Sequence, residues 1–124
     1  MSSTSCYSEA LRLVKEAVDS YAKYRKDSKV NDLKNALASL LRSYVMLLKG
    51  HYLPELDLTN LASIALDEGI IDKELYSDIV TANLVLNGYL SRDLSVVEEV
   101  FSKLFEKLSK HDPYVSQQMY LFRY

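Results

Sequence analysis

The sequence of 124 residues is poor in the residues that carry most metal and redox chemistry, with one cysteine, two histidines and no tryptophan. A single cysteine, Cys6, cannot form an internal disulfide, and it excludes a zinc site built from several cysteines. The two histidines, His51 and His111, leave little material for histidine-based metal or acid–base chemistry. We therefore expect neither a metal nor a cofactor.

Long apolar runs are also missing. No run approaches the roughly 18 residues that a bilayer span needs, and the first seven residues lack the basic start and apolar stretch of a secretory signal. The length fits one domain. We therefore expect a single cytoplasmic domain over residues 1–124, without a membrane contact.

Charge is small in total but uneven along the chain. The net charge is −2 and the pI is about 5.7, which argues against a general nucleic-acid binder, including a DNA binder. Residues 1–51 hold nine Lys/Arg against five Asp/Glu, residues 52–100 hold two against ten, and residues 101–124 hold four against two. This pattern predicts a basic side and an acidic side, which suits docking between protein surfaces, self-association included. Ordinary solvated helix faces are the alternative.

The few glycines and prolines fall between stretches of helical periodicity, at Gly50, Pro54, Gly69, Gly88 and Pro113. No stretch shows sustained alternation of period two, so the fold class is all-α, a bundle with short connections. The predicted helices span about residues 7–26, 32–49, 58–67, 73–86 and 95–110. The apolar stripe is widest in the second helix, which we expect to be central. Residues 1–6 are expected to be disordered.

Several residue patterns predict where these helices begin. Ser5, Asn31 and Asp57 are typical N-cap residues just before the first, second and third helices. Ser95 and Glu98 have the spacing of a capping box, in which each side chain accepts from the other residue's free amide.

The C-terminal segment, residues 112–124, ends in the aromatic tail Met119–Tyr124. Left in water, this tail would be an exposed apolar patch. It either packs on its own bundle or docks on another subunit.

A basic run, Lys23-Tyr24-Arg25-Lys26, interleaves a tyrosine with cations at the end of the first predicted helix. Cations could contact RNA phosphates while the tyrosine stacks on a base, and Arg92 is a further candidate RNA contact. The alternative is a plain helix C-terminus, where cations suit the helix dipole.

Two asparagines, Asn83 and Asn87, lie four residues apart and hence on one face of the fourth predicted helix. Asparagine is a mediocre helix former. A left-handed C-terminal cap explains Asn87 and Gly88. It leaves Asn83 unexplained, and a buried asparagine is costly without hydrogen-bond partners.

The stretch LASIALDEGIIDKEL, residues 61–75, resembles the corresponding part of the HepT-like HEPN proteins. These are small, all-helical and usually dimeric proteins of bacteria and archaea, many of them encoded beside a minimal nucleotidyltransferase. The similarity continues through Asn83, Asn87-Gly88-Tyr89 and Asp93, and it covers about residues 58–110. It implies an up-and-down bundle that forms a two-fold dimer, with the fourth helix facing its mate.

Active members of that family resemble metal-independent RNases and carry an arginine, four intervening residues, a histidine, any residue and a tyrosine. On this chain the arginine position is Ala82, the histidine position is Asn87 and the tyrosine position is Tyr89. Both charged catalytic groups are missing. In family members paired with a nucleotidyltransferase, the tyrosine can be nucleotidylated, which makes Tyr89 a candidate modification site.

The resemblance thus implies a toxin–antitoxin type protein without RNase activity, a dimeric binding module for a minimal nucleotidyltransferase or RNA. Its candidate site is a motif face of Asn83, Asn87, Gly88 and Tyr89. One alternative is an active ribonuclease in which Lys23, Arg25 or Arg92 replaces the missing arginine in space. Another alternative is a purely structural dimerisation bundle.

Overall fold

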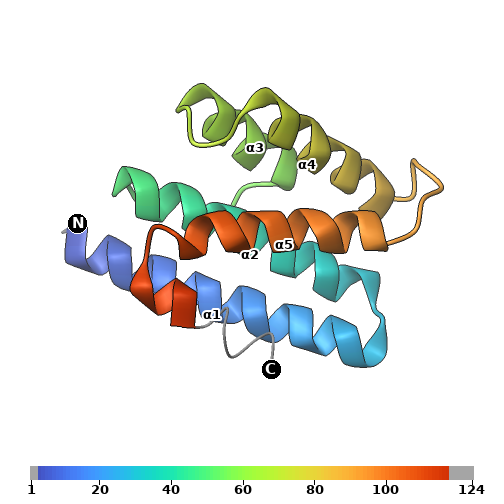
Figure 1. Cartoon of the computed structure of the whole chain (residues 1–124), viewed down its shortest axis with the longest axis horizontal. Helices are drawn as coiled ribbons and strands as arrows, with labels where there is room; N and C mark the ends of the chain where they lie inside the picture. The colour runs from blue at the N-terminus through green and yellow to red at the C-terminus, as the bar shows by residue number, and fades with distance from the viewer. Residues whose placement is uncertain (1–2, 118–124) are drawn as a thin grey trace.

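Five α-helices make up most of the chain in the computed structural model, which describes residues 3–117, with side chains from Cys6 onward (Figure 1). They are α1 (Ser3–Asp27), α2 (Val30–Lys49), α3 (Leu58–Asp67), α4 (Lys73–Leu86) and α5 (Ser95–Ser109). A further helical turn spans residues 113–117, and this described part contains no strand. The predicted all-α class is confirmed. In the same residues no helix combines the length and apolar character that crossing a membrane requires.

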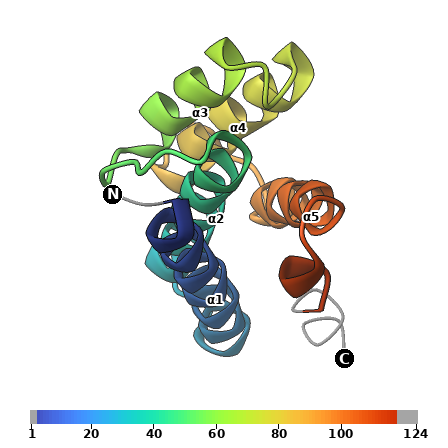
Figure 2. The ribbon, with the colours of Figure 1, turned by 90° about the vertical axis from the view of Figure 1, so that its left-hand side faces the viewer.

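Helix α2 is the centre of the bundle. It packs on α1 along its length, on α3 and α4 on the other side, and on α5 beside it (Figure 2). The predicted central role of the second helix is confirmed by its burial. Its buried residues are Leu33, Ala36, Leu37, Leu40, Leu41, Ser43, Tyr44, Val45 and Met46.

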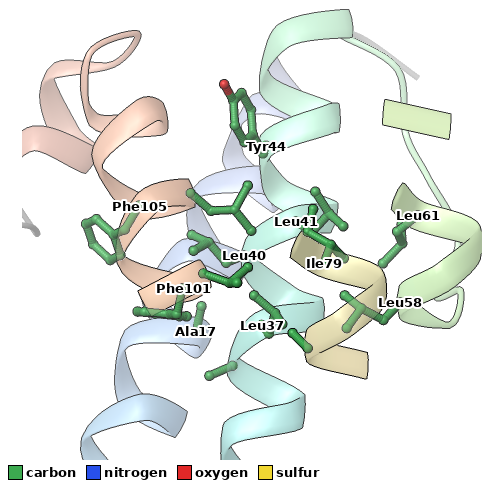
Figure 3. Close-up of a cluster of buried hydrophobic side chains, with 14 of the residues drawn as sticks. Ala17, Leu37, Leu40, Leu41, Tyr44, Leu58, Leu61, Ile79, Phe101 and Phe105 are labelled. Carbon is green, nitrogen blue, oxygen red and sulfur yellow. The ribbon is translucent and has the colours of Figure 1, made fainter. Parts of the chain in front are cut away.

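The core forms where side chains of α2 meet those of all the other helices. Figure 3 shows Leu40 of α2 between the α5 side chain Phe101 on one side and the α4 side chain Ile79 on the other. Tyr21 of α1 stacks on Phe101, with ring centroids 4.4 Å apart. The apolar stripe of α2 is therefore shared among four partners.

The direction of α3 departs from a strict up-and-down order. Lys49 at the end of α2 pairs with Glu68 just after α3, at 3.0 Å, while the start of α3 lies beside the middle of α2 (Figure 1). The two helices therefore run parallel, and the expected alternation is wrong at this step. The connection over residues 50–57 runs back along α2, where the Arg42 guanidinium donates to the Leu53 carbonyl at 2.8 and 3.0 Å.

Several predicted helix ends are confirmed. The Asp57 carboxylate accepts from the Asn60 amide at 2.8 Å and caps α3. Gly50 ends α2 with φ +68, a left-handed conformation that glycine adopts without a steric penalty. Its amide donates to the Met46 carbonyl at 2.8 Å, so the last turn is satisfied.

Two other helices begin earlier than predicted. Helix α1 starts at Ser3, so Ser5 is inside the helix and is not its N-cap; residues 1–2 lie outside the described residues. Cys6 packs in a small cluster with Met46 of α2, and this burial extends the helix. In α2, Asn31 is already helical, and the N-cap residue Lys29 makes no side-chain cap.

The predicted capping box at the start of α5 is wrong. The Ser95 amide donates to the Asp93 carboxylate at 3.0 Å. Glu98 accepts instead from the Tyr24 hydroxyl of α1, at 2.9 Å. The local pattern assigns the Glu98 carboxylate to the start of its own helix, but in the structure it bonds to a residue far away in the sequence.

Asp112 ties the C-terminal helical turn to α1. Its carboxylate accepts from the Val115 amide at 3.2 Å and from the Tyr7 hydroxyl at 2.7 Å. The predicted aromatic tail, Met119–Tyr124, lies outside the described residues.

Because Leu40 is fully buried at the meeting point of four helices, we expect Leu40→Ala to lower the free energy of unfolding by about 2–5 kcal/mol. Urea unfolding followed by circular dichroism measures this change. Leu84→Ala, on the exposed side of α4, is the matched control and should cost much less. Equal losses in the two variants would contradict the central position of Leu40.

Candidate functional site

A chain of side-chain hydrogen bonds crosses three helices at the motif face. The Lys34 ammonium of α2 donates to Asn87 Oδ1 at 3.0 Å. Asn87 Nδ2 donates to Asn83 Oδ1 at 3.2 Å, and Asn83 Nδ2 donates to Thr59 Oγ1 of α3 at 3.2 Å. We call these four residues the polar chain. It supplies the partners that Asn83 requires.

Sequence reasoning missed Lys34. It lies 53 residues before Asn87, and its local pattern marks it only as a polar position beside the buried Leu33. The signal that brings it to the motif face is the packing of α2 on α4, which no short sequence pattern encodes. Among the described residues, Lys34 has no carboxylate within ion-pair distance, so its charge is not locally compensated.

Gly88 and Tyr89 complete the motif face. Gly88 has φ +79 and ends α4 in the left-handed conformation, as predicted for Asn87-Gly88. The Tyr89 amide then donates to the Leu84 carbonyl at 2.8 Å. The side chain of Tyr89 is 78% exposed, which makes it the most accessible large apolar residue in the described part of the chain. This side chain is therefore largely open to solvent.

Ala82, the arginine position implied by the family resemblance, faces the core. It is fully buried, whereas Asn83 and Asn87 are partly or fully exposed. An arginine at position 82 would enter the core and not the motif face. Positive charge reaches this face from α2 instead.

The turn between α1 and α2 and the connection from α4 to α5 lie at one end of the bundle, on the right of Figure 1. Residues 23–34 and 87–93 carry six Lys/Arg against three Asp there. We call this region the basic end; its cations are Lys23, Arg25, Lys26, Lys29, Lys34 and Arg92. The opposite end holds the α3–α4 turn, where residues 67–74 carry four Asp/Glu against one Lys. The turns at the two ends of the bundle therefore differ in the sign of their charge.

No hydrogen bond links the candidate RNA contacts Lys23, Arg25, Lys26 and Arg92 to the motif asparagines. Lys23, Arg25, Lys26 and Arg92 are all exposed, and none of them is hydrogen-bonded to Asn83 or Asn87. Arg92 borders a cleft of about 310 Å³ between α4 and α5, where Lys103 pairs with Asp78 at 3.5 Å. None of the replacements that the sequence suggested for the missing arginine is therefore bonded to the motif asparagines.

Tyr24 is not available for stacking on a base. It is only 7% exposed, and its hydroxyl donates to Glu98. Burial raises the pKa of Tyr24 to about 12, and the hydrogen bond to the Glu98 carboxylate adds to the rise. Tyr24 therefore has a structural role that links α1 to α5, and its interpretation as an RNA contact is wrong.

The polar chain offers an anion one cation and several hydrogen-bond donors. Its members are two amides, one hydroxyl and one ammonium, with no carboxylate, imidazole or thiol among them. In residues 6–117, no cluster of three or more His, Cys, Asp or Glu side chains is placed to hold a metal ion. The arrangement fits phosphate binding better than acid–base catalysis.

Comparisons with protein-family models, curated proteins and solved structures give no match to this chain. The candidate site therefore rests on its own geometry and on the sequence resemblance.

The raised pKa of Tyr24 predicts a loss of stability at high pH. In the unfolded chain the phenol titrates near pH 10, whereas in the folded chain it keeps its proton up to about pH 12. The unfolded state therefore releases this proton first, and the free energy of unfolding falls between about pH 10 and 12. Urea unfolding at a series of pH values should show a shallower fall for Tyr24→Phe. An unchanged slope would show that Tyr24 does not contribute.

Proposed function

We propose that this protein is a HepT-like binding module that holds RNA phosphates at its basic end without hydrolysing them. The observation that carries the proposal is Lys34, an uncompensated cation that Asn87 holds at the motif face. The family assignment itself rests on the sequence resemblance.

The polar chain supports phosphate binding because it fixes the direction of each donor. Lysine has three donors, and the bond to Asn87 uses one of them, so two remain for a phosphate oxygen. The next two bonds, through Asn83 to Thr59, hold the Asn87 amide in place. Ordering the ammonium before RNA arrives lowers the entropy cost of binding.

The surrounding cations favour a ligand with many phosphates, such as RNA, over a ligand with a single phosphate. Lys26 and Lys29 flank the same end of the bundle, and both are exposed. Cations spread over such a surface bind RNA by releasing counterions, so the affinity falls steeply with salt. The exposed ring of Tyr89 offers a stacking surface for a base, which Tyr24 does not.

Lys34→Gln should weaken the binding of a single-stranded RNA 12-mer. The slope of log K against log salt concentration should become shallower by about 0.7, which is the effect of one lost phosphate contact. Fluorescence anisotropy at several salt concentrations measures both quantities. Lys15→Gln, on an exposed part of α1, removes the same charge away from the basic end and should change binding much less.

Two results would overturn this function. If the protein binds no RNA at low salt, or if the two lysine variants weaken binding equally, the basic end is not the binding surface. Metal-independent cleavage of the 12-mer that is lost in Lys34→Gln and Tyr89→Phe would establish the second candidate function. In that case the protein is a ribonuclease in which Lys34 takes the charge-stabilising place of the arginine.

The resemblance also suggests a two-fold dimer and a minimal nucleotidyltransferase as partner, and the accessible Tyr89 hydroxyl supports this part of the proposal. Co-expression with such an enzyme should add one nucleotide to Tyr89, seen by peptide mass spectrometry. Tyr52, which is 48% exposed, is an internal control that should stay unmodified. Modification of both tyrosines, or of neither, would contradict a specific role for Tyr89.

A further inference from the structure

A second cleft lies away from the motif face, between α1, α2 and the connection that precedes α3. Its volume is about 260 Å³, and it shares no lining residue with the polar chain. Leu56 is half-buried at its wall, whereas Leu13 and Leu61 are buried beneath its floor. Drug-sized ligands occupy pockets of about 300–1,000 Å³, so this cleft suits a smaller molecule.

Helix α2 presents a polar stripe to this cleft. Asn35, Ser39 and Arg42 follow one another at spacings of four and three residues, which places them on one face of the helix. Among the described residues, the side chains of Asn35 and Ser39 have no hydrogen-bond partner. The stripe therefore offers free amide and hydroxyl groups beside a guanidinium.

Arg42 is held in place by a neutral group. Its Nε and one terminal nitrogen donate to the Leu53 carbonyl, and its guanidinium lies 5.7 Å from the centre of the Tyr52 ring. No carboxylate in the described residues comes within ion-pair distance of Arg42. This is a positioned cation with one terminal nitrogen left to donate to an anion.

The other arginine in the cleft differs. Arg12 pairs with Glu9 and Glu16, which neutralise its charge. Glu55, by contrast, lines the cleft and has no hydrogen bond or ion pair within the described part of the chain. The cleft thus carries one cation without a salt bridge, Arg42, which attracts Glu9 at longer range, and one anion without a salt bridge, Glu55.

We propose that this cleft binds a small zwitterion with an apolar body, of the chemical class of a free aliphatic amino acid. The carboxylate pairs with Arg42 and accepts from Ser39, the ammonium pairs with Glu55, and the aliphatic part lies against Leu56. Each charge of the ligand then meets a charge of opposite sign that forms no salt bridge of its own, and neither is buried alone.

L-leucine is the probe, and two analogues carry one charge each: isovalerate, the anion, and isopentylamine, the cation. We expect L-leucine to shift the amide signals of Ser39 and Arg42 saturably in ¹H–¹⁵N NMR spectra of the full chain. Each analogue should bind about ten-fold more weakly, because each leaves one charged hydrogen bond unmade.

Glu55→Gln is the decisive variant, because Glu55 contacts no other side chain through a hydrogen bond or ion pair and its replacement should leave the fold intact. This variant should bind L-leucine only as tightly as it binds isovalerate, and its affinity for isovalerate should be unchanged. Arg42→Gln should abolish the binding of both L-leucine and isovalerate. It also removes the hydrogen bond from Arg42 to the Leu53 carbonyl in the 50–57 connection. Lys15→Gln, outside the cleft, should bind as the unmodified chain does.

Three results would overturn the proposal. The first is the absence of saturable shifts with L-leucine in the chain that carries Glu55. The second is isovalerate binding as tightly as L-leucine, which makes the cleft a simple anion site. The third is unchanged L-leucine affinity in Glu55→Gln. None of these outcomes depends on RNA, so they are independent of the proposed function.

Discussion

Helix α2 packs against each of the other four helices, and both candidate sites depend on this packing. Its buried face takes the apolar side chains of α1, α3, α4 and α5, which leaves two polar strips at its margins. One strip carries Lys34 to the end of α4, and the other carries Ser39 and Arg42 into the cleft beside α1. A rotation of α2 about its axis would remove both arrangements while keeping an all-helical bundle.

The helical architecture was readable from the sequence because its determinants are local. Apolar spacing and the positions of Gly50 and Gly69 located the helices to within a few residues, and the cap residue Asp57 forms its predicted bond. The errors arose where a distant partner overrode a local signal. Glu98 bonds to Tyr24 of α1 in place of its own helix start, and Cys6 packs near α2.

The candidate site was predicted in part. Asn83 and Asn87 share a face because they are four residues apart, a rule that holds for any helix. Lys34 and the burial of Tyr24 depend on how helices cross, which the residue pattern of one helix does not specify. The parallel course of α3 depends likewise on a connection that runs back along α2, anchored by Arg42. Tertiary packing therefore changed the chemistry of the site more than it changed the fold.

We propose that bound RNA contacts the polar chain itself. The side-chain amide signals of Asn83 and Asn87 in ¹H–¹⁵N NMR spectra report on this directly, because these groups hold Lys34 in place. Titration with a short single-stranded RNA should shift both signals together, along with the backbone amides of the α1–α2 turn. Shifts confined to the acidic α3–α4 turn, or RNA binding that leaves both asparagine signals unmoved, would contradict the account.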